Sequence, residues 1–280
     1  MLHYFVMAIL FIINCITPRE YITGNQFRAC ADYHIDAPRI GFNPANISSE
    51  SIIYIKTDFL EYFFTQVFPQ LTHPVTLITH NSDYSAPGKF SAYLDDPKII
   101  RWYGQNCDFI HPKFIPIPIG IANAEWAHGN PRIFDQILDQ LKEKTVKKKH
   151  KLYINFAATN PLRPQLMKYF ENTSFVEIVK PKPFRDYLLE MSRYQFILSP
   201  FGNGLDCHRT WEALLVGSIP VVKSSTLDAL YKDLPVIIVE NWSDINWEIL
   251  EQKRKNLKNK RSNSNKLYME YWRNKIKSKK

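Results

Sequence analysis

The sequence predicts an α/β protein built from two Rossmann-like domains that face each other across a cleft. Short apolar segments alternate with helical segments in both halves of the chain, which is typical of parallel strands covered by helices on both faces. The length of 280 residues accommodates two domains of about 130 residues each. Ligands bind such sheets beyond the carboxyl ends of the strands, so we expect functional residues in the loops there.

The N-terminal half has three apolar, β-branched segments that favour strands. Asp58 is expected to cap a helix that stops before Pro69, because proline interrupts helical hydrogen bonding. A basic helix then separates the two halves. The predicted elements are strands Ile52–Lys56, Val75–Thr79 and Ile99–Trp102, a helix from Asp58 to Phe68, extended chain over Phe114–Ile121 and a helix from Pro131 to Lys148.

The C-terminal half alternates strands and helices more regularly. Ser243 is expected to cap a last helix that continues into a basic tail. The predicted strands are Leu152–Phe156, Phe175–Val179, Gln195–Ser199, Ile219–Val222 and Val236–Val239, and the predicted helices are Arg163–Phe170, Phe184–Met191, Asp206–Val216 and Leu227–Tyr231. We therefore divide the chain into residues 1–16, a first domain over 17–149, a second domain over 150–250 and a basic helix or tail over 251–280.

The net charge of +9 comes from the end of the chain. The segment Lys253–Lys280 holds 12 of the 36 basic residues and one of the 27 acidic residues, so the other 252 residues carry a net charge of −2. Such runs are typical of solvated faces or frayed ends, with contact to a membrane surface or a polyanion as the alternative. The charge distribution therefore does not favour a nucleic-acid-binding function.

The first 16 residues are nearly all apolar over Leu2–Ile16. This stretch is shorter than the ~20 residues of a comfortable transmembrane helix, and it resembles a signal-peptide core or a short signal anchor. We expect a protein of the secretory pathway or the membrane, of Golgi or ER type in a eukaryote. A buried first strand and a cytoplasmic location are the alternative.

The four cysteines lie far apart and show no metal-binding spacing, so no structural metal is expected.

The most informative segment runs from the strand that ends at Ser199 to Val222. The strand enters a loop with Gly202 and Gly204, which permit positive φ and close approach of a ligand to the backbone. Asp206 is expected to cap the helix that follows. The N-terminus of this helix presents unpaired N–H groups and the positive end of its dipole to the loop, a geometry that suits a diphosphate.

Two charged side chains lie on the predicted helix, three positions apart. Arg209 could grip phosphate oxygens with two hydrogen bonds. Glu212 shares its helical face and could accept hydrogen bonds from ribose hydroxyls or hold Arg209 in place. A surface ion pair between the two is the alternative. The segment is neither a P-loop, since no Gly-Lys-Ser/Thr follows, nor a dinucleotide fingerprint, since the third glycine is absent.

This segment resembles the donor-binding part of exostosin-like glycosyltransferases, glycosyltransferase family 47. The shared pattern is an apolar strand, Ser/Cys-Pro, a glycine-containing loop, Arg, Glu-Ala-Leu/Ile and Gly-x-Ile/Val-Pro-Val/Ile. The matching residues are Ser199-Pro200, Gly202, Arg209, Glu212-Ala213-Leu214 and Gly217-Ser218-Ile219-Pro220-Val221. The clearer resemblance covers Leu152–Trp247, and the first half resembles the family only loosely.

The resemblance implies the B-type glycosyltransferase fold, with the donor in the C-terminal domain and a glycan or other hydroxyl acceptor on the N-terminal side. It also implies inverting transfer from a nucleotide-diphosphate sugar, UDP- or GDP-linked. The chain has no Asp-x-Asp pair that could hold a divalent ion on the diphosphate, so we expect no metal. Positively charged groups of the protein must then stabilise the negative charge of the leaving diphosphate. The donor-binding residues we expect are Ser199, Gly202, Asn203, Gly204, Asp206, His208, Arg209, Glu212 and Lys223.

Inverting transfer needs a base that takes the proton of the acceptor hydroxyl. His80 and Asp83 follow the strand Val75–Thr79, and Glu125 follows a later extended segment, so these three are the candidates. His208 could instead touch the donor sugar or phosphate. The alternative functions are a relative that binds sugar nucleotide or glycan without turnover, another nucleotide-binding Rossmann protein, and a basic nucleic-acid binder.

Overall fold

A computed structural model describes residues 19–37, 43–143, 146–257 and 264–278. The predicted signal or anchor segment, residues 1–16, lies outside the described residues, so it stays a prediction, as does the cellular location. Within the described parts of the chain, no helix is both long and apolar enough to cross a bilayer.

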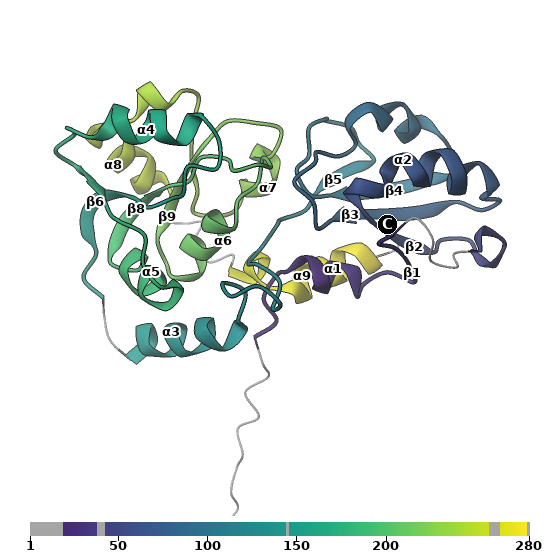
Figure 1. Cartoon of the computed structure of the whole chain (residues 1–280), viewed down its shortest axis with the longest axis horizontal. Coiled ribbons are helices and arrows are strands. Elements are labelled where there is room, and N and C mark those ends of the chain that lie inside the picture. The colour runs from purple at the N-terminus through teal and green to yellow at the C-terminus, as the bar shows by residue number, and fades with distance from the viewer. Residues whose placement is uncertain (1–18, 38–42, 144–145, 258–263, 279–280) are drawn as a thin grey trace, which may run out of the picture.

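The first sheet has five parallel strands in the order β1-β2-β3-β4-β5. The predicted strands of this half are present, whereas the three-residue β1 was not foreseen because it is too short to show a pattern. Helix α1 lies under the sheet (Figure 1). The elements are α1 Gly24–Arg28, β1 Tyr33–Ile35, β2 Ile52–Lys56, α2 Leu60–Tyr62, β3 Val75–His80, β4 Ile99–Gly104, β5 Phe114–Pro116 and α3 Pro131–Glu143.

The second sheet is also parallel, with the strand order β10-β9-β8-β6-β7. Its central strand pairs Phe196 with Leu152 of β6 and with Ile219 of β9. The elements are β6 Lys149–Ile154, α4 Leu162–Phe170, β7 Val176–Ile178, α5 Phe184–Met191, β8 Tyr194–Leu198, α6 His208–Leu215, β9 Ile219–Lys223, α7 Asp228–Tyr231, β10 Ile237–Val239 and α8 Trp247–Asn256.

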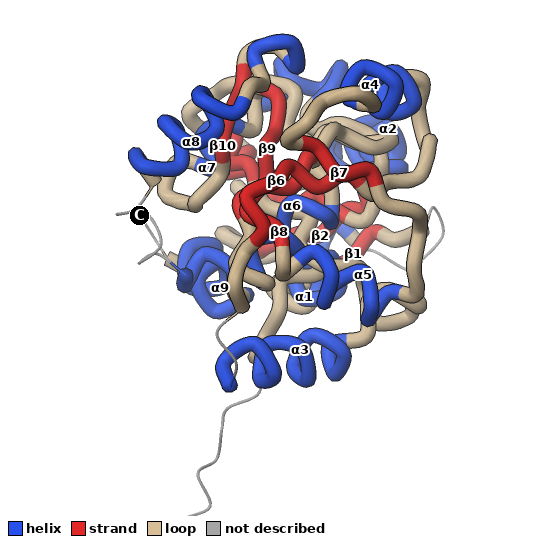
Figure 2. The backbone as a smooth tube through the Cα atoms, turned by 90° about the vertical axis from the view of Figure 1, so that its left-hand side faces the viewer, coloured by secondary structure: helices blue, strands red, loops and turns tan. Residues whose placement is uncertain are grey.

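Two parallel five-stranded sheets with helical connections confirm the predicted α/β fold class of two Rossmann-like domains (Figures 1 and 2). The apolar runs that predicted the strands are buried on both faces: all six residues of β3 and all five of β8 are buried. The chain leaves β6 toward β7 and leaves β8 toward β9, in opposite directions along the sheet. This reversal opens a crevice at the carboxyl ends of β6 and β8.

The described residues 264–278 pack on the first domain and do not form a frayed tail. Helix α9, Met269–Lys277, lies beside α1 (Figures 1 and 2). Its Met269, Trp272 and Ile276 are buried in the apolar cluster of the first sheet. For these residues the prediction of a frayed end was wrong, because apolar residues spaced along one helical face are buried, whereas Lys277 on the other side is exposed as predicted for a solvated face.

Three predicted helix caps were also wrong. Asp58 lies within a short 3₁₀ turn that begins after Lys56. Ser243 lies within another such turn, and the side chain of Asn246 caps α8 by accepting from the amide of Ile249 at 2.9 Å. Cys207, not Asp206, occupies the N-cap position of α6. In each case the N-cap position lies within three residues of the predicted one, and of these positions only Asn246 makes a side-chain capping hydrogen bond.

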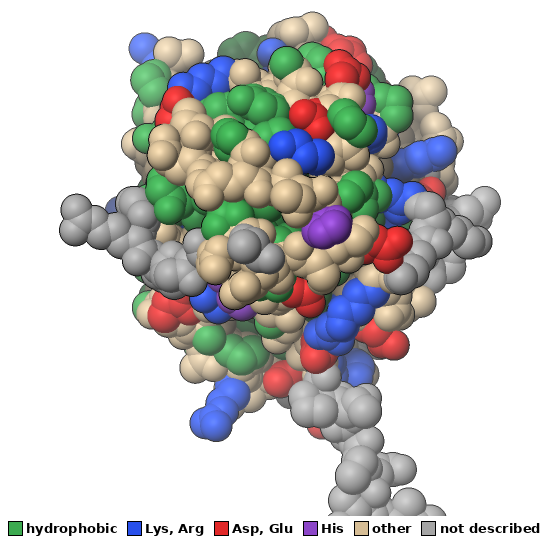
Figure 3. Space-filling model, turned by 90° about the vertical axis from the view of Figure 1, so that its right-hand side faces the viewer, with side chains coloured by type: hydrophobic (Ala, Val, Ile, Leu, Met, Phe, Trp, Pro, Cys, Tyr) green, Lys and Arg blue, Asp and Glu red, His purple; other side chains and the backbone are tan. Residues whose placement is uncertain are grey.

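Helix α3 is shorter than predicted. It ends at Glu143, and Lys149 already belongs to β6. The division of the chain into domains at residues 149 and 150 stays a prediction. The end of the molecule formed by the first sheet carries interspersed acidic and basic side chains around apolar ones (Figure 3).

Candidate functional site

A cleft of about 1380 Å³ is lined by residues from both halves of the chain. Its walls come from the loop after β3, the chain after β5, the loop after β6 and the loop between β8 and α6. Ten of the twelve predicted site residues line it: His80, Asp83, Glu125, Gly202, Asn203, Gly204, Asp206, His208, Arg209 and Glu212.

The other two predicted residues do not line this cleft. Ser199 is buried at the end of β8, and its hydroxyl lies 2.8 Å from that of Thr210, so it ties the strand to α6. Lys223 is exposed at the end of β9. Neither position supports a direct contact with a ligand in the cleft.

The two loop glycines are needed for space and not for backbone conformation. Neither Gly202 nor Gly204 has a positive φ. A Cβ added to Gly204 would lie 2.4 Å from the side-chain nitrogen of Asn106, and one added to Gly202 would lie 3.1 Å from Arg163. The loop therefore packs directly against polar side chains of both halves of the chain.

Arg163 holds this loop in place, and it was not among the predicted site residues. From α4 its Nε donates to the carbonyl of Phe201 at 3.1 Å, and its Nη2 donates to the carbonyl of Pro200 at 3.3 Å. The side chain is buried, and burial lowers the pKa of its guanidinium. Only the fold brings α4 to a loop almost 40 positions away, so no local motif could show the contact.

Arg209 is a cation with unused hydrogen-bonding capacity. Its Nε is buried and has no hydrogen-bond partner among the described residues, and no described acid forms an ion pair with it. Its Nη1 contacts the sulfur of Cys207 at 3.7 Å. The guanidiniums of Arg209 and Arg163 lie 5.2 and 5.5 Å from the ring centre of Phe156. Neither guanidinium forms an ion pair among the described residues, although Glu212 lies near Arg209, and two such neighbouring positive charges suit an anionic ligand.

Glu212 lies near Arg209 but does not form a surface ion pair with it, so that alternative interpretation was wrong. Its carboxyl is buried and accepts a hydrogen bond from the hydroxyl of Tyr187 at 3.0 Å. Burial raises the pKa of Glu212 to about 7, although the charge of Arg209 opposes the shift. Only one carboxyl oxygen takes part in this hydrogen bond, and Glu212 lines the cleft.

Asp206 joins the two halves of the chain beneath the cleft. One carboxyl oxygen accepts from the amide of Ile119 and from the indole of Trp211, both at 2.8 Å. The other accepts from the amide of Cys207 at 2.8 Å and from the hydroxyl of Tyr231 at 3.1 Å. Burial raises its pKa, while these four donors oppose the shift. With all of its hydrogen bonds inside the protein, Asp206 is a positioning residue.

The three predicted bases differ in their surroundings. His80 is buried, with Nε2 3.0 Å from the carbonyl of Pro118 and Nδ1 accepting from the amide of Asn81 at 2.7 Å. Burial lowers its pKa to about 4. Both ring nitrogens are thus occupied, and His80 would have to break a hydrogen bond to accept a proton.

Asp83 and Glu125 are both exposed. A carboxyl oxygen of Asp83 accepts from the side chain of Asn203 at 3.1 Å, which bridges the cleft. Glu125 accepts from the side chain of Asn25 at 3.1 Å. Both carboxylates therefore retain free lone pairs.

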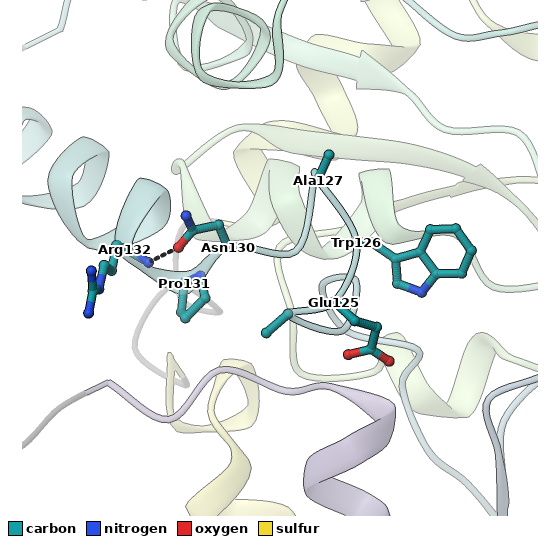
Figure 4. Close-up of a pocket in the computed structure, with 7 residues that line it drawn as sticks. Glu125, Trp126, Ala127, Asn130, Pro131 and Arg132 are labelled. Atoms are coloured by element: carbon teal, nitrogen blue, oxygen red, sulfur yellow. Dashed lines mark hydrogen bonds between the residues drawn. The ribbon is translucent and has the colours of Figure 1, made fainter.

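Glu125 and Trp126 stand at the mouth of the cleft on the chain that leads to α3. The two side chains project from the same loop, which also borders a smaller hollow of about 380 Å³ (Figure 4). At the α3 end of this hollow, the amide of Arg132 donates to the side chain of Asn130 at 3.0 Å.

Within the described ranges, no group of three or more His, Cys, Asp or Glu side chains could hold a metal ion. The expectation of metal independence stays a prediction.

A family model described as the RXYLT1 C-terminal domain matches residues 134–280. The chain belongs to this family. The RXYLT1 C-terminal domain match includes the loop with Gly202 and Gly204, Arg209 and Glu212, whereas the three predicted bases lie before it. The exostosin-like resemblance is not the family that this model reports, and it stays a prediction.

Solved structures resemble the chain at low identity. One is the pneumococcal O-GlcNAc transferase GtfA in complex with UDP and GlcNAc, with 10% identity, 83% of this chain and 54% of that chain covered, and a TM-score of 0.31. The second is AviGT4, a glycosyltransferase involved in avilamycin A biosynthesis, with 12% identity, 87% and 96% covered, and a TM-score of 0.33. The third is WaaG, a glycosyltransferase involved in lipopolysaccharide biosynthesis, with 10% identity, 93% and 98% covered, and a TM-score of 0.37.

The chain spans about half the length of GtfA. These likenesses concern the fold alone. No curated protein matches the chain significantly.

Proposed function

We propose that this protein is a glycosyltransferase that moves a sugar from a nucleotide-diphosphate donor to a hydroxyl of a glycan or another acceptor. The observation that carries this proposal is Arg209, a cation in the cleft whose Nε has no hydrogen-bond partner among the described residues. A buried donor left without a partner costs about 1–3 kcal/mol. A bound diphosphate would supply that partner.

The reaction needs positive charge at the leaving group. As the bond from the sugar to the diphosphate breaks, negative charge develops on the diphosphate oxygens. Donors fixed in place before the reaction stabilise that charge without reorganising. Arg209 is held against Phe156, and Arg163 fixes the adjacent loop through its carbonyls. This rigidity supports a donor site that functions without a metal ion.

Glu212 is suited to the nucleoside part of the donor. Its carboxyl is oriented by Tyr187 and lines the cleft beside Arg209. A carboxyl there can accept hydrogen bonds from ribose hydroxyls, which all common nucleotide-diphosphate sugars carry. We propose a UDP- or GDP-linked sugar as donor.

Two exposed aromatic side chains support a carbohydrate acceptor. Tyr84 and Trp126 line the cleft on the side of the first sheet, with exposed fractions of 67% and 60%. Aromatic rings present large flat apolar faces, and the C–H faces of sugar rings can stack on them. This placement supports an acceptor on the N-terminal side of the cleft. We also propose transfer with inversion, which the exostosin-like resemblance implies.

The test is release of nucleoside diphosphate from a panel of UDP- and GDP-sugars, with EDTA present. We expect turnover by the wild-type protein, and a loss of about 10²–10³-fold in kcat for Arg209→Lys, because lysine cannot reproduce the two-pronged contact. Arg132→Lys, which alters an exposed arginine outside the cleft, is the matched control. A wild-type protein that binds sugar nucleotides but never releases the diphosphate would favour the non-catalytic alternative.

A further inference from the structure

His208 has one ring nitrogen committed to the protein and the other free. Its Nδ1 lies 2.8 Å from the carbonyl oxygen of Gly120. A carbonyl oxygen can only accept, so Nδ1 carries the proton and donates it. The neutral ring then has its lone pair on Nε2, and no described group forms a hydrogen bond with Nε2.

His208 is one of the residues that form the cleft. It lies at the start of α6, next to Arg209. A neutral imidazole with its lone pair on Nε2 can accept a hydrogen bond from a hydroxyl. It cannot donate one to a phosphate. Of the two donor groups expected to contact His208, the sugar and the phosphate, this chemistry argues against the phosphate.

Resting on the proposed function, we propose that Nε2 of His208 is the base of the transfer reaction. The acceptor O–H bond breaks and its proton moves to Nε2. The oxygen forms a bond to the anomeric carbon, and the bond from that carbon to the diphosphate oxygen breaks. The diphosphate leaves with the electron pair toward Arg209, and the imidazolium later returns its proton to water.

The groups around the ring keep it neutral at pH 7. Burial lowers the pKa of His208, and the nearby ring of His128, 6.2 Å away between ring centres, lowers it further. The carboxylate of Asp83 and the carbonyl of Gly120 oppose the shift. His80, the remaining imidazole nearby, is held neutral by its own burial. Compared with His80, whose two nitrogens are occupied, His208 has the free acceptor that the reaction requires.

The test compares His208→Asn and His208→Ala with the wild-type protein. The amide nitrogen of asparagine can take the place of Nδ1 and donate to Gly120, so this variant keeps the structural contact and loses only the base. We expect kcat for diphosphate release from the best sugar nucleotide to fall about 10²–10⁴-fold. The dissociation constant of UDP or GDP, measured by calorimetry, should stay within about twofold.

Two further readouts separate a base from a structural residue. The wild-type rate should decline on the acidic side as Nε2 becomes protonated, and this decline should disappear in His208→Asn. Added imidazole should restore part of the rate of His208→Ala. An active His208→Asn protein, or a loss of UDP or GDP binding that matches the loss of rate, would overturn the inference. A wild-type protein inactive with every donor would instead overturn the proposed function, and this inference with it.

Discussion

At the scale of single residues, the cleft contains Arg209, whose Nε lacks a hydrogen-bond partner among the described residues, and Glu212, whose carboxyl is costly to ionise because it is buried. Burial raises the pKa of Glu212, next to Arg209 in the cleft, from its ordinary 4.5 to about 7. Perturbed groups of this kind gather at functional sites. Both residues line the cleft, and no hydrogen bond or ion pair joins them. A ligand with an anionic group for Arg209 and hydroxyl groups for Glu212 would satisfy both.

Glu212→Gln should change how stability depends on pH. Between pH 4.5 and 7 the unfolded wild-type chain loses this proton while the folded chain keeps it, so the free energy of unfolding falls as pH rises. Above pH 7 the accumulated cost is constant at roughly 3 kcal/mol. Glutamine does not ionise and escapes this cost. The melting temperature of the variant relative to wild type should therefore increase from pH 5 to pH 8.

Scanning calorimetry at four pH values across this range gives the comparison. Glu248→Gln, an exposed glutamate of α8, is the matched control. A difference between Glu212→Gln and wild type that does not vary with pH would show that Glu212 is ionised at little cost in the folded protein.

At the scale of elements, helix α9 completes the first domain although it comes from the other end of the chain. Its Trp272 is buried, packs edge-on against Phe27 and donates from its indole to the carbonyl of Lys266 at 3.1 Å. Arg273 pairs with Glu20 at 2.8 Å. The last helix is therefore part of the core around α1, and not an appendage that can be removed without effect.

Trp272→Ala should destabilise the protein by about 3–5 kcal/mol, because it leaves a large cavity in a packed core. Trp126→Ala removes an indole that is 60% exposed and should leave the free energy of unfolding nearly unchanged. Urea unfolding of the two variants gives both values. Equal stabilities would mean that α9 does not pack on the first domain as described.

The helices and strands could largely be predicted from the sequence, but the contacts between them could not. Helix α5, Phe184–Met191, and strand β2, Ile52–Lys56, have the predicted bounds, since their apolar patterns are local. Asp206 was predicted as a cap because its position before a helix is also local. Its actual partners include Ile119 and Tyr231, and no spacing in the sequence relates these positions.

The same limit applies to the site. Arg209 and Glu212 were found because they lie three positions apart on one helix. Arg163 was missed because only the packing of α4 against the loop after β8 brings it there. The free nitrogen of His208 could not be predicted, since it depends on the carbonyl of Gly120, which comes from the other half of the chain.

At the scale of the whole molecule, the two sheets meet through buried polar and apolar contacts beside the cleft. Asp206 accepts from the amide of Ile119 at 2.8 Å, and its own amide donates to the side-chain oxygen of Asn106 at 2.9 Å, so it bonds to the other half of the chain twice. Trp211 and Leu214 of α6 belong to the same apolar cluster as the strands of the first sheet. The cleft walls are therefore tied together at their base, which supports a site whose geometry is largely fixed before a ligand binds.

The central claim is that the cleft binds a nucleoside diphosphate through Arg209. The most direct measurement is the thermal stabilisation of the protein by UDP and GDP in EDTA, for wild type, Arg209→Ala and the control Arg132→Ala. A ligand at 100 times its dissociation constant should stabilise the fold by about 2.7 kcal/mol, a shift of a few degrees for a chain of this size. We predict this shift for wild type and the control, and its loss in Arg209→Ala. A folded wild-type protein that shows no shift with either nucleotide, or an equal shift in Arg209→Ala, would contradict the claim.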